Sequence, residues 1–230
     1  MNVCAVIPAG GQGTRLGGTV PKQFQTLREK PILHYTLRTF QESGLIDSLV
    51  LVVPEKELES ACADWLERPP VVKQVVVGGE KRQDSVFNGY QALPTDTDIV
   101  LVHDGVRPFL SKGMIQETIH VAGKFGAAIT AIPVHDTLKQ VDVSGLVQRT
   151  VERDGLWRVQ TPQAFRYDLL GEAFRKAQAD SFYGTDEGAL IENLGQEVRV
   201  VNGSEWNLKI TRPEDLEMGE SIVAKLFLEG

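Results

Sequence analysis

A glycine-rich segment near the start of the chain carries two cations at fixed places. Residues 7–23 read Ile-Pro-Ala-Gly-Gly-Gln-Gly-Thr-Arg-Leu-Gly-Gly-Thr-Val-Pro-Lys-Gln. Backbone N–H groups that no side chain shields can wrap a phosphate. The guanidinium of Arg15 can fork across two phosphate oxygens, and Lys22 adds a point charge. Pro21 fixes the backbone just before that lysine. We therefore predict a loop that holds a triphosphate while a nucleophile attacks it.

This segment differs from the two commonest nucleotide-binding motifs. A dinucleotide fingerprint needs Gly-x-Gly-x-x-Gly after the first strand and an acid at the end of the second. Here Leu16 stands at the third glycine, and the expected acid is absent. A P-loop needs Gly-Lys-Ser/Thr, but Gly123-Lys124 is followed by Phe125. The sequence therefore disfavours both a dehydrogenase and a P-loop enzyme.

A second chemical element is the carboxylate of Asp104, which follows the apolar run 99–102. A carboxylate directly after a buried strand lies at the edge of the sheet where open α/β folds bind ligands. Mg²⁺ prefers one or two carboxylates together with phosphate oxygens and water. We predict Asp104 to be a metal ligand, the alternative being an aspartate that caps the turn at Gly105. His103 beside it is predicted to be structural.

The elements that must position these residues are strands and helices in alternation. Continuous apolar, β-branched runs are typical of strands buried on both faces, and they span 3–7, 49–53, 71–77, 99–102, 127–133 and 198–201. Helical segments are predicted at about 31–42, 55–66, 82–92, 112–124, 168–179, 186–194 and 213–227. Ser111 is predicted to cap the helix at 112, and Thr211-Arg-Pro-Glu214 to form a capping box. The alternation predicts an α/β fold with a mostly parallel sheet and helices on both faces.

One stretch breaks the alternation. Residues 139–151 are two short β-like runs joined at Ser144-Gly145, which predicts a hairpin arm inserted at about 136–156 into a single domain spanning 1–230. An isolated two-stranded hairpin is barely stable in water. We therefore expect the arm to pack on something, and a second copy of the chain is the obvious candidate.

Composition narrows the class of partner. The net charge of −7 argues against a general nucleic-acid binder, which needs a basic face. Residues 1–30 hold four cations against Glu29 alone, a balance of +3, so the remaining 200 residues carry −10. A small anion would be drawn to the first segment. No apolar stretch approaches the roughly 20 residues of a membrane span. Two cysteines give no disulfide framework, and with no apparent signal segment we expect a cytoplasmic protein.

Seven motifs then occur in an order that resembles one family over nearly the whole chain. They are the loop at 8–23, Gly78-Gly-Glu-Lys-Arg82-Gln-Asp84-Ser85-Val, His103-Asp-Gly-Val-Arg-Pro108, Arg153-Asp-Gly-Leu-Trp157, Thr161-Pro-Gln163, Thr185-Asp-Glu187 and Asn207-Leu-Lys-Ile-Thr-Arg-Pro-Glu-Asp215. The ordered set resembles the 2-C-methyl-D-erythritol 4-phosphate cytidylyltransferases. That family uses CTP and Mg²⁺ to make a cytidine diphospho-polyol and pyrophosphate in the non-mevalonate isoprenoid pathway. The resemblance implies a Rossmann-like fold and a homodimer held by the arm.

The resemblance also implies a role for each matching residue. Arg15 and Lys22 would be catalytic and would stabilise the transition state, and Asp104 would lie at the metal. The CTP site would be lined by Pro8, Ala9, Gly10, Gly11, Gly13, Gly79 and Ser85. The polyol phosphate would be bound by Arg107, Thr137, Arg153, Thr161, Thr185 and Lys209. The attacking phosphate is already an oxyanion at neutral pH, so no strong general base is required, and catalysis would rest on positioning and electrostatics.

Two alternatives remain at this stage. The first is the same chemistry with ribitol 5-phosphate as acceptor. The stretch 153–163 favours methylerythritol phosphate, because its Arg-x-x-Leu-Trp form resembles those enzymes more closely. The second is a non-catalytic nucleotide-binding module, which would not need Arg15, Lys22 and Asp104 all in place.

Overall fold

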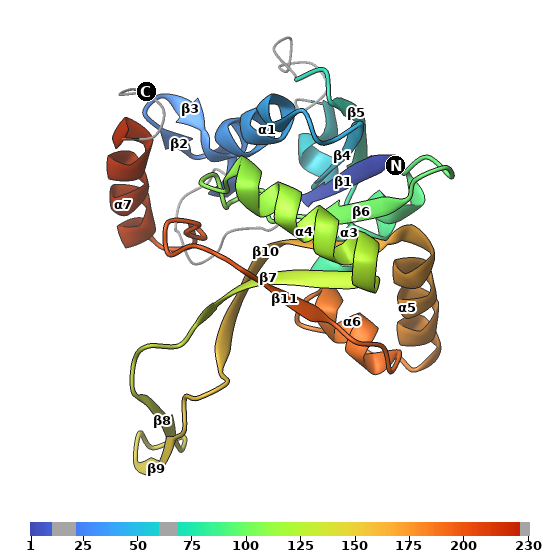
Figure 1. Cartoon of the computed structure of the whole chain (residues 1–230). Coiled ribbons are helices and arrows are strands. Elements are labelled where there is room, and N and C mark those ends of the chain that lie inside the picture. The colour runs from blue at the N-terminus through green and yellow to red at the C-terminus, as the bar shows by residue number, and fades with distance from the viewer. Residues whose placement is uncertain (11–21, 60–68, 226–230) are drawn as a thin grey trace.

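The computed structural model describes residues 1–10, 22–59 and 69–225. Its centre is a seven-stranded sheet in the order β11-β7-β10-β6-β1-β4-β5 (Figure 1). The strands are β1 (Val3–Pro8), β4 (Ser48–Val53), β5 (Val72–Val77), β6 (Ile99–Val102), β7 (Ala127–Pro133), β10 (Trp157–Arg166) and β11 (Arg199–Asn202). Only β10 runs antiparallel to its neighbours, β6 and β7. The predicted α/β fold with a mostly parallel sheet is confirmed.

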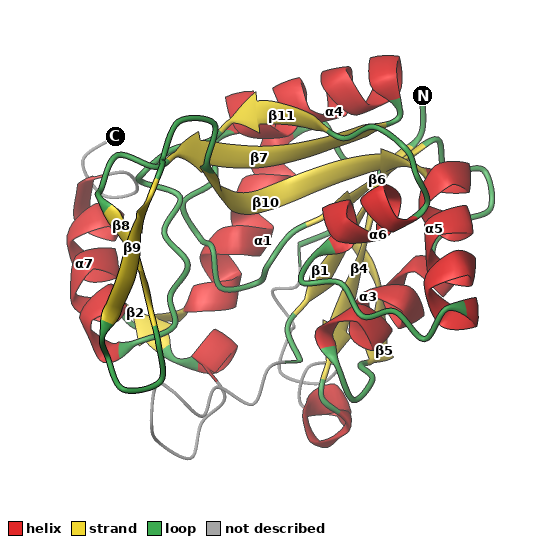
Figure 2. Ribbon diagram, turned by 90° about the horizontal axis from the view of Figure 1, so that it is seen from below, coloured by secondary structure: helices red, strands yellow, loops and turns green. Residues whose placement is uncertain are grey.

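Helices cover both faces of this sheet (Figure 2). They are α1 (Ile32–Ser43), α3 (Arg82–Gln91), α4 (Lys112–Phe125), α5 (Tyr167–Ala179), α6 (Glu187–Asn193) and α7 (Pro213–Val223), with 3-10 turns η1 (Lys22–Phe24) and η2 (Glu55–Glu57). No helix within the described ranges has the length and apolar character of a membrane span.

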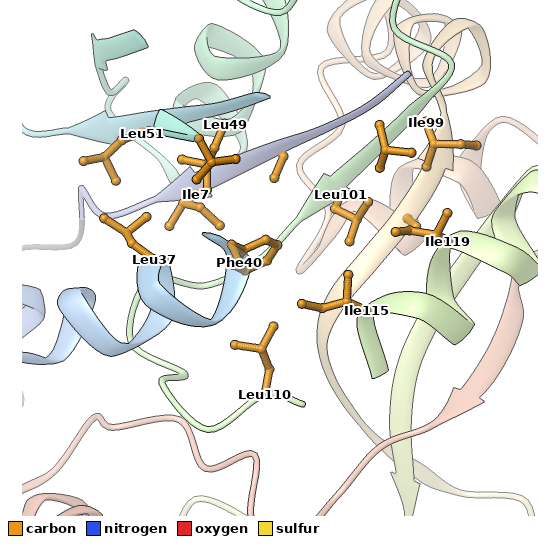
Figure 3. Close-up of a cluster of buried hydrophobic side chains, with 14 of the residues drawn as sticks. Ile7, Leu37, Phe40, Leu49, Leu51, Ile99, Leu101, Leu110, Ile115 and Ile119 are labelled. Carbon is orange, nitrogen blue, oxygen red and sulfur yellow. The ribbon is translucent and has the colours of Figure 1, made fainter. Parts of the chain in front are cut away.

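Alternate residues of β1 separate two hydrophobic cores. Ile7 packs with the buried faces of α1 and α4, including Phe40 and Ile115 (Figure 3). Val6 points the other way and packs with α3, α5 and α6. Because a strand turns successive side chains to opposite faces, one apolar run supplies both cores. This explains why β1 reads as continuously hydrophobic.

Helix α3 lies unusually close to the sheet. A Cβ at Gly89 would stand 2.4 Å from Cγ1 of Val6 and 2.8 Å from Cγ2 of Val52, so only glycine allows this approach. The contact seats the C-terminal half of α3 directly on β1 and β4.

Most predicted element boundaries are correct within one or two residues, but several elements differ. The last helix, predicted over 213–227, is an α-helix only to Val223, and the short hairpin at 26–31 was not predicted. The segment 55–66 begins as the turn η2, and most of it lies outside the described residues. The last helix is capped one residue later than predicted, because Asp215 rather than Glu214 accepts from the backbone N–H of Arg212. Ser111 does cap α4, since its hydroxyl accepts from the N–H of Met114.

Strand β10 was also not predicted from the sequence. Its residues Gln160, Pro162 and Gln163 are atypical of a central strand, since proline cannot donate to a ladder. The pairing with β7 is irregular between Val159 and Gln163, and Pro162 occupies that break. Gln163 is fully buried but satisfied, because it donates to Asp186 and accepts from the N–H of Gly188. Hydrogen bonds to distant segments therefore stabilise this strand, and the sequence pattern does not show them.

Two small hairpins stand apart from the central sheet. One joins β2 (Thr26–Leu27) and β3 (Lys30–Pro31), and the other joins β8 (Leu138–Val141) and β9 (Val147–Val151). The second is the predicted arm, and it projects from the ends of β7 and β10 (Figure 1). Its apolar side chains Val141, Val143, Leu146 and Val147 are exposed.

Candidate active site

A pocket of about 550 Å³ opens at the carboxyl ends of the parallel strands. It collects residues that lie far apart in the sequence, and several of them are the predicted site residues. From this set it is lined by Pro8, Ala9, Gly10, Gly79, Ser85, Asp104 and Lys209. The loop after β1, the N-terminus of α3, the end of β6 and the segment before α7 therefore meet at one place.

The loop between β5 and α3 forms one wall of the pocket. The N–H of Gly79 donates to the hydroxyl of Ser85 at 3.1 Å, and that hydroxyl lies 3.1 Å from the carbonyl oxygen of Lys81. A Cβ at Gly79 would stand 2.4 Å from Cβ of Asp84, so the turn requires a glycine. Ser85 thus shapes the wall that the sequence assigned to the nucleotide.

Three cations surround the carboxylate of Asp104. Lys209 Nζ lies 2.7 Å from Oδ2, Arg82 Nε lies 3.2 Å from Oδ1, and Arg107 Nε lies 3.6 Å from Oδ2. Burial alone would raise the pKa of Asp104, but the positive charges of Arg82, Lys209 and Arg107 outweigh it and hold that pKa well below its usual range. Asp104 is therefore ionised throughout the physiological range.

The local charge balance suits an anionic ligand. The described lining of the pocket is balanced, because Lys81, Arg82 and Lys209 stand against Glu55, Glu80 and Asp104. The positive excess lies in the cluster around Asp104, where Arg82, Arg107 and Lys209 oppose Asp104 and Glu187 and leave a net charge of one positive. Because the pocket walls exclude part of the solvent, this excess acts through a lower dielectric than it would in water.

The backbone of Asp104 is fixed from below by a chain of hydrogen bonds. Its N–H donates to Thr161 Oγ1 at 3.1 Å, and that hydroxyl lies 3.0 Å from His103 Nδ1. His103 Nε2 lies 3.0 Å from the carbonyl oxygen of Arg107, which can only accept. The neutral ring must therefore carry its proton on Nε2 and accept from Thr161 through Nδ1. As predicted, His103 is structural, and Thr161 is buried beneath the pocket.

We expect this buried histidine to make stability depend on pH. Burial lowers the pKa of His103 to about 4 from 6.5, so the unfolded chain takes up its proton first as pH falls. The contribution of His103 to the free energy of unfolding is therefore fully present above pH 6.5. It is lost as pH falls through 4, by about 3 kcal/mol. Urea unfolding of the nucleotide-free protein across this range measures the effect.

The matched variant is His103→Gln, whose amide can donate and accept but does not titrate in this range. It should show a flatter pH dependence between about 6.5 and 4. Asp104 changes the free energy of unfolding only at lower pH, because its pKa in the folded protein is depressed. Equal slopes for the two proteins would contradict the assignment to His103.

The remaining predicted residues fall into three groups. Arg107 lies behind Asp104, and its Nη1 donates to the carbonyl oxygen of Asn207 at 2.9 Å. Thr137 and Arg153 are exposed at the base of the arm, where Arg153 donates to the carbonyl oxygen of His135, and Thr185 is exposed just before α6. None of these last three lines the pocket as far as the described residues define it. Gly11, Gly13 and Arg15 lie outside the described residues, and of Lys22 only the backbone is described, in η1.

Sequence reasoning assigned no role to two charged residues of this site. Arg82 lines the pocket, and its Nη1 lies 2.8 Å and 2.9 Å from the two carboxylate oxygens of Glu187. Both residues stand inside motifs that carried the family resemblance, which was the available signal. Gln23 also lines the pocket and is buried, with no hydrogen-bond partner for its amide among the described residues.

The donor set is compatible with a magnesium ion that arrives with a nucleotide. Among the described residues no cluster of three or more acids, histidines or cysteines forms a metal cage. Asp104 nevertheless supplies one permanently ionised carboxylate to the pocket, and Mg²⁺ bound to phosphates commonly takes only one or two carboxylates. Lys209 occupies Oδ2 in this structure, so a metal on that oxygen requires the ammonium to move.

An open α/β sheet, a pocket with Lys81, Arg82 and Lys209 at the carboxyl ends of its strands, and a glycine-rich segment that begins at Gly10 together fit a nucleotidyltransferase. The family model described as IspD, 2-C-methyl-D-erythritol 4-phosphate cytidylyltransferase, matches residues 3–225, and the chain belongs to this family. It is a cytidylyltransferase that uses CTP and 2-C-methyl-D-erythritol 4-phosphate in isoprenoid synthesis.

Individual relatives agree with this placement. The chain is 44% identical over 223 residues to the 2-C-methyl-D-erythritol 4-phosphate cytidylyltransferase of Pelotomaculum thermopropionicum, covering 96% of this chain and 94% of the other. It is 42% identical over 226 residues to that of Syntrophus aciditrophicus, covering 97% and 96%. The crystal structure of 4-diphosphocytidyl-2C-methyl-D-erythritol synthase from Anaerococcus prevotii superposes with a TM-score of 0.84 at 33% identity, covering 96% and 98%. The assignment to the methylerythritol phosphate enzymes, rather than to the ribitol 5-phosphate enzymes, is thus confirmed.

Proposed function

We propose that the pocket holds the triphosphate of CTP and that Arg15 and Lys22 neutralise the charge that develops during attack. The observation that carries this proposal is the ring of three cations around Asp104, which leaves a net positive charge. Gly10 lines the pocket where the glycine-rich segment begins, so that segment starts at the right place. Pro8, Ala9, Gly11, Gly13, Gly79 and Ser85 complete the nucleotide half of the site.

The acceptor half is assigned to residues on the other side of Asp104. Lys209 and Arg107 both approach Oδ2 of Asp104, whereas Arg82 approaches Oδ1, and we assign the first two to the acceptor's phosphate. Thr161 acts from below through the N–H of Asp104. Thr185 approaches from the segment before α6, while Thr137 and Arg153 lie at the base of the arm.

The chemistry follows from charge. One phosphate monoester oxygen of the acceptor attacks the α-phosphorus of CTP, and the bond from that phosphorus to the pyrophosphate oxygen breaks. Both reactants are anions, so the barrier is repulsion rather than weak nucleophilicity. Cations held in place before the reaction lower this barrier without having to reorganise. Lys209 and Arg107 would hold the attacking phosphate in line, which supplies the positioning contribution.

We also propose that Mg²⁺ accompanies CTP and that Asp104 is its protein ligand. When bound, the ion would neutralise phosphate charge. The protein's part is to keep this carboxylate ionised, which the cations around it ensure, and to hold its backbone through Thr161. Chelation of divalent ions should abolish pyrophosphate release, and added Mg²⁺ should restore it.

Pyrophosphate release tests the proposed site chemistry as a whole. The wild-type protein should release pyrophosphate from CTP with 2-C-methyl-D-erythritol 4-phosphate, and much more slowly with ribitol 5-phosphate. If the protein releases pyrophosphate with neither of the two acceptors, the assigned roles are contradicted and a module that only binds nucleotides is favoured. A panel of ATP, GTP, UTP and CTP measures base preference in the same assay.

Lys209→Ala is expected to weaken use of the acceptor while leaving the affinity for CTP similar. The ammonium is one of two cations assigned to the incoming phosphate, and a charge-assisted hydrogen bond is worth about 1.5–3 kcal/mol, so kcat/KM for the acceptor should fall at least tenfold, by about 10–150-fold. Steady-state kinetics with each substrate varied in turn measures the two effects. A large loss of CTP binding instead would place Lys209 in the nucleotide half.

We propose further that the chain forms one nucleotidyltransferase domain, with the arm at about 136–156 as an insertion that docks on a second copy. Four apolar side chains of the arm are exposed, and Val143 has no cover at all. A two-stranded hairpin needs an apolar surface to pack against. Because Thr137 and Arg153 lie at the base of the arm, docking would carry them toward the other copy's pocket. We place this homodimer in the cytoplasm, where CTP is available, and cell fractionation checks that location.

Replacing Val143 and Leu146 together with aspartate should convert a dimer into a monomer. Two charges in an apolar contact cost several kcal/mol, because each must be desolvated. Sedimentation velocity measures the change in mass, and far-UV circular dichroism checks that the fold is intact. Activity should fall in parallel if the arm supplies Arg153 to the second copy. A variant that stays dimeric would contradict docking through the arm.

A further inference from the structure

Arg82 joins two carboxylates that belong to different parts of the site. Its Nη1 lies 2.8 Å and 2.9 Å from the oxygens of Glu187, and its Nε lies 3.2 Å from Oδ1 of Asp104. Arg82 is the first residue of α3, Glu187 is the first residue of α6, and Asp104 follows β6. One guanidinium therefore ties the nucleotide wall to the segment that carries Thr185.

The neighbouring residue Gln83 reinforces the same connection. Its Nε2 donates to the carbonyl oxygen of Phe182 at 3.1 Å, and its Oε1 accepts from the N–H of Gly184 at 2.9 Å. On the other side of Arg82, the ammonium of Lys81 lies 3.4 Å from the ring centroid of Tyr183. Three consecutive residues at the start of α3 thus grip one segment, 182–187. This set of contacts is here named the α3 clasp.

The charge pair within the clasp is poorly explained by stability alone. Glu187 is 1% exposed, and burial raises the pKa of its carboxyl against the opposing charge of Arg82. Removing two charges from water is expensive, and apolar residues of similar volume often stabilise a fold as well or better. A buried pair is better explained where it fixes a geometry, and here it fixes the orientation of Asp104 relative to α6.

We propose that Arg82 and Glu187 are positioning residues that couple the nucleotide half of the active site to its acceptor half. The inference rests on the proposed roles of Asp104 and Thr185. Arg82 holds the Asp104 carboxylate in one orientation. Glu187 holds Arg82 and stands two residues along the chain from Thr185, so the same ion pair fixes the segment that carries that threonine. The clasp acts through the orientation of Asp104 and of the segment 182–187, without needing to touch the reacting phosphorus.

Kinetics of a conservative change test this coupling. Glu187→Gln keeps the shape and one acceptor oxygen but removes the charge. Changes to residues that orient a site's ligands typically cost about 10–100-fold in activity, and we expect kcat/KM for the acceptor to fall by that factor. The KM for CTP should change much less, because Gly79 and Ser85 are held by their own contacts. Gln83→Ala should shift the acceptor parameters in the same direction by a smaller factor.

A paired substitution separates positioning from folding. Arg82→Met together with Glu187→Leu removes both charges, so no buried charge is left without a partner. The thermal unfolding midpoint of this double variant should lie near the wild-type value, while its kcat/KM for the acceptor stays low. Recovery of both properties would show that the pair is only structural and would overturn the inference. Equal increases in the KM values for CTP and for the acceptor, with kcat unchanged, would also overturn the inference.

The matched control is an exposed ion pair away from the pocket. Arg38 Nε lies 2.7 Å from Glu42 Oε1 on α1, and Glu42→Gln makes the same chemical change there. Its kinetics should equal those of the wild-type protein. Pyrophosphate release by the wild type and by this control tests the proposed function separately. If neither protein releases pyrophosphate, the function fails, whereas activity in both with no change in Glu187→Gln means that the coupling fails.

Discussion

Asp104→Asn should lower kcat about a hundredfold or more. The substitution keeps the shape of the side chain but removes the charge that Arg82, Arg107 and Lys209 share. The local balance of charge would rise from one positive to two. The proposed metal would lose its anionic protein ligand, and the cations would lose the carboxylate that offsets their mutual repulsion. Pyrophosphate release at saturating CTP and acceptor measures the loss.

The same variant should also be less stable, but only moderately. Breaking a fully buried ion pair costs about 3–5 kcal/mol, and Arg82 and Lys209 are each about a third exposed, so we expect about 2 kcal/mol. Binding of CTP without a divalent ion should not weaken, because the pocket becomes more positive. Asp98→Asn, at the opposite end of the same strand, is the control. Near-normal turnover of Asp104→Asn would remove Asp104 from the mechanism.

Lys22→Ala should reduce turnover by about 10²-fold or more, a typical cost of removing one preorganised donor. The backbone around this lysine is well placed for the role. Gln23, the next residue, is buried and lines the pocket, and Phe24 packs against the core below α1. The turn η1, which begins at Lys22, therefore lies at the pocket. Pro21, directly before this lysine, has a fixed backbone φ angle.

The kinetic pattern distinguishes this role from simple nucleotide binding. If Lys22 acts mainly on the charge that develops during attack, kcat and kcat/KM should fall together. A rise in the KM for CTP with kcat unchanged would mean that Lys22 binds ground state and transition state equally. Lys73→Ala, an exposed lysine on β5, is the control for loss of one positive charge. Turnover close to the wild-type rate would disprove the catalytic assignment.

Part of the pocket lining could be predicted because its signals in the sequence are local. Pro8, Ala9 and Gly10 follow a buried strand, and Asp104 follows another, so the rule for ligand sites in parallel sheets brings them together. Lys209 came from the family resemblance rather than from its surroundings. The described structure then places it 2.7 Å from Asp104, which no spacing in the sequence indicates.

The rest depends on contacts between distant segments. Arg82 and Glu187 are 105 residues apart, and neither shows a periodic pattern that would pair them. Thr161 was assigned to the acceptor, and its burial under Asp104 follows from β10, whose polar residues concealed the strand. A buried glutamine or threonine looks like a loop residue until its hydrogen-bond partners are known, because the partners supply the free energy that the pattern lacks.

The antiparallel strand β10 has a consequence for how the arm can vary. Trp157 is paired with Pro133, so the strands that leave and re-enter the sheet are already neighbours where the arm begins. Everything between them is, in topological terms, the tip of one long hairpin. The entropy of closing such a tip rises only with the logarithm of its length. The tip can therefore be lengthened, shortened or exchanged while the central sheet keeps its register.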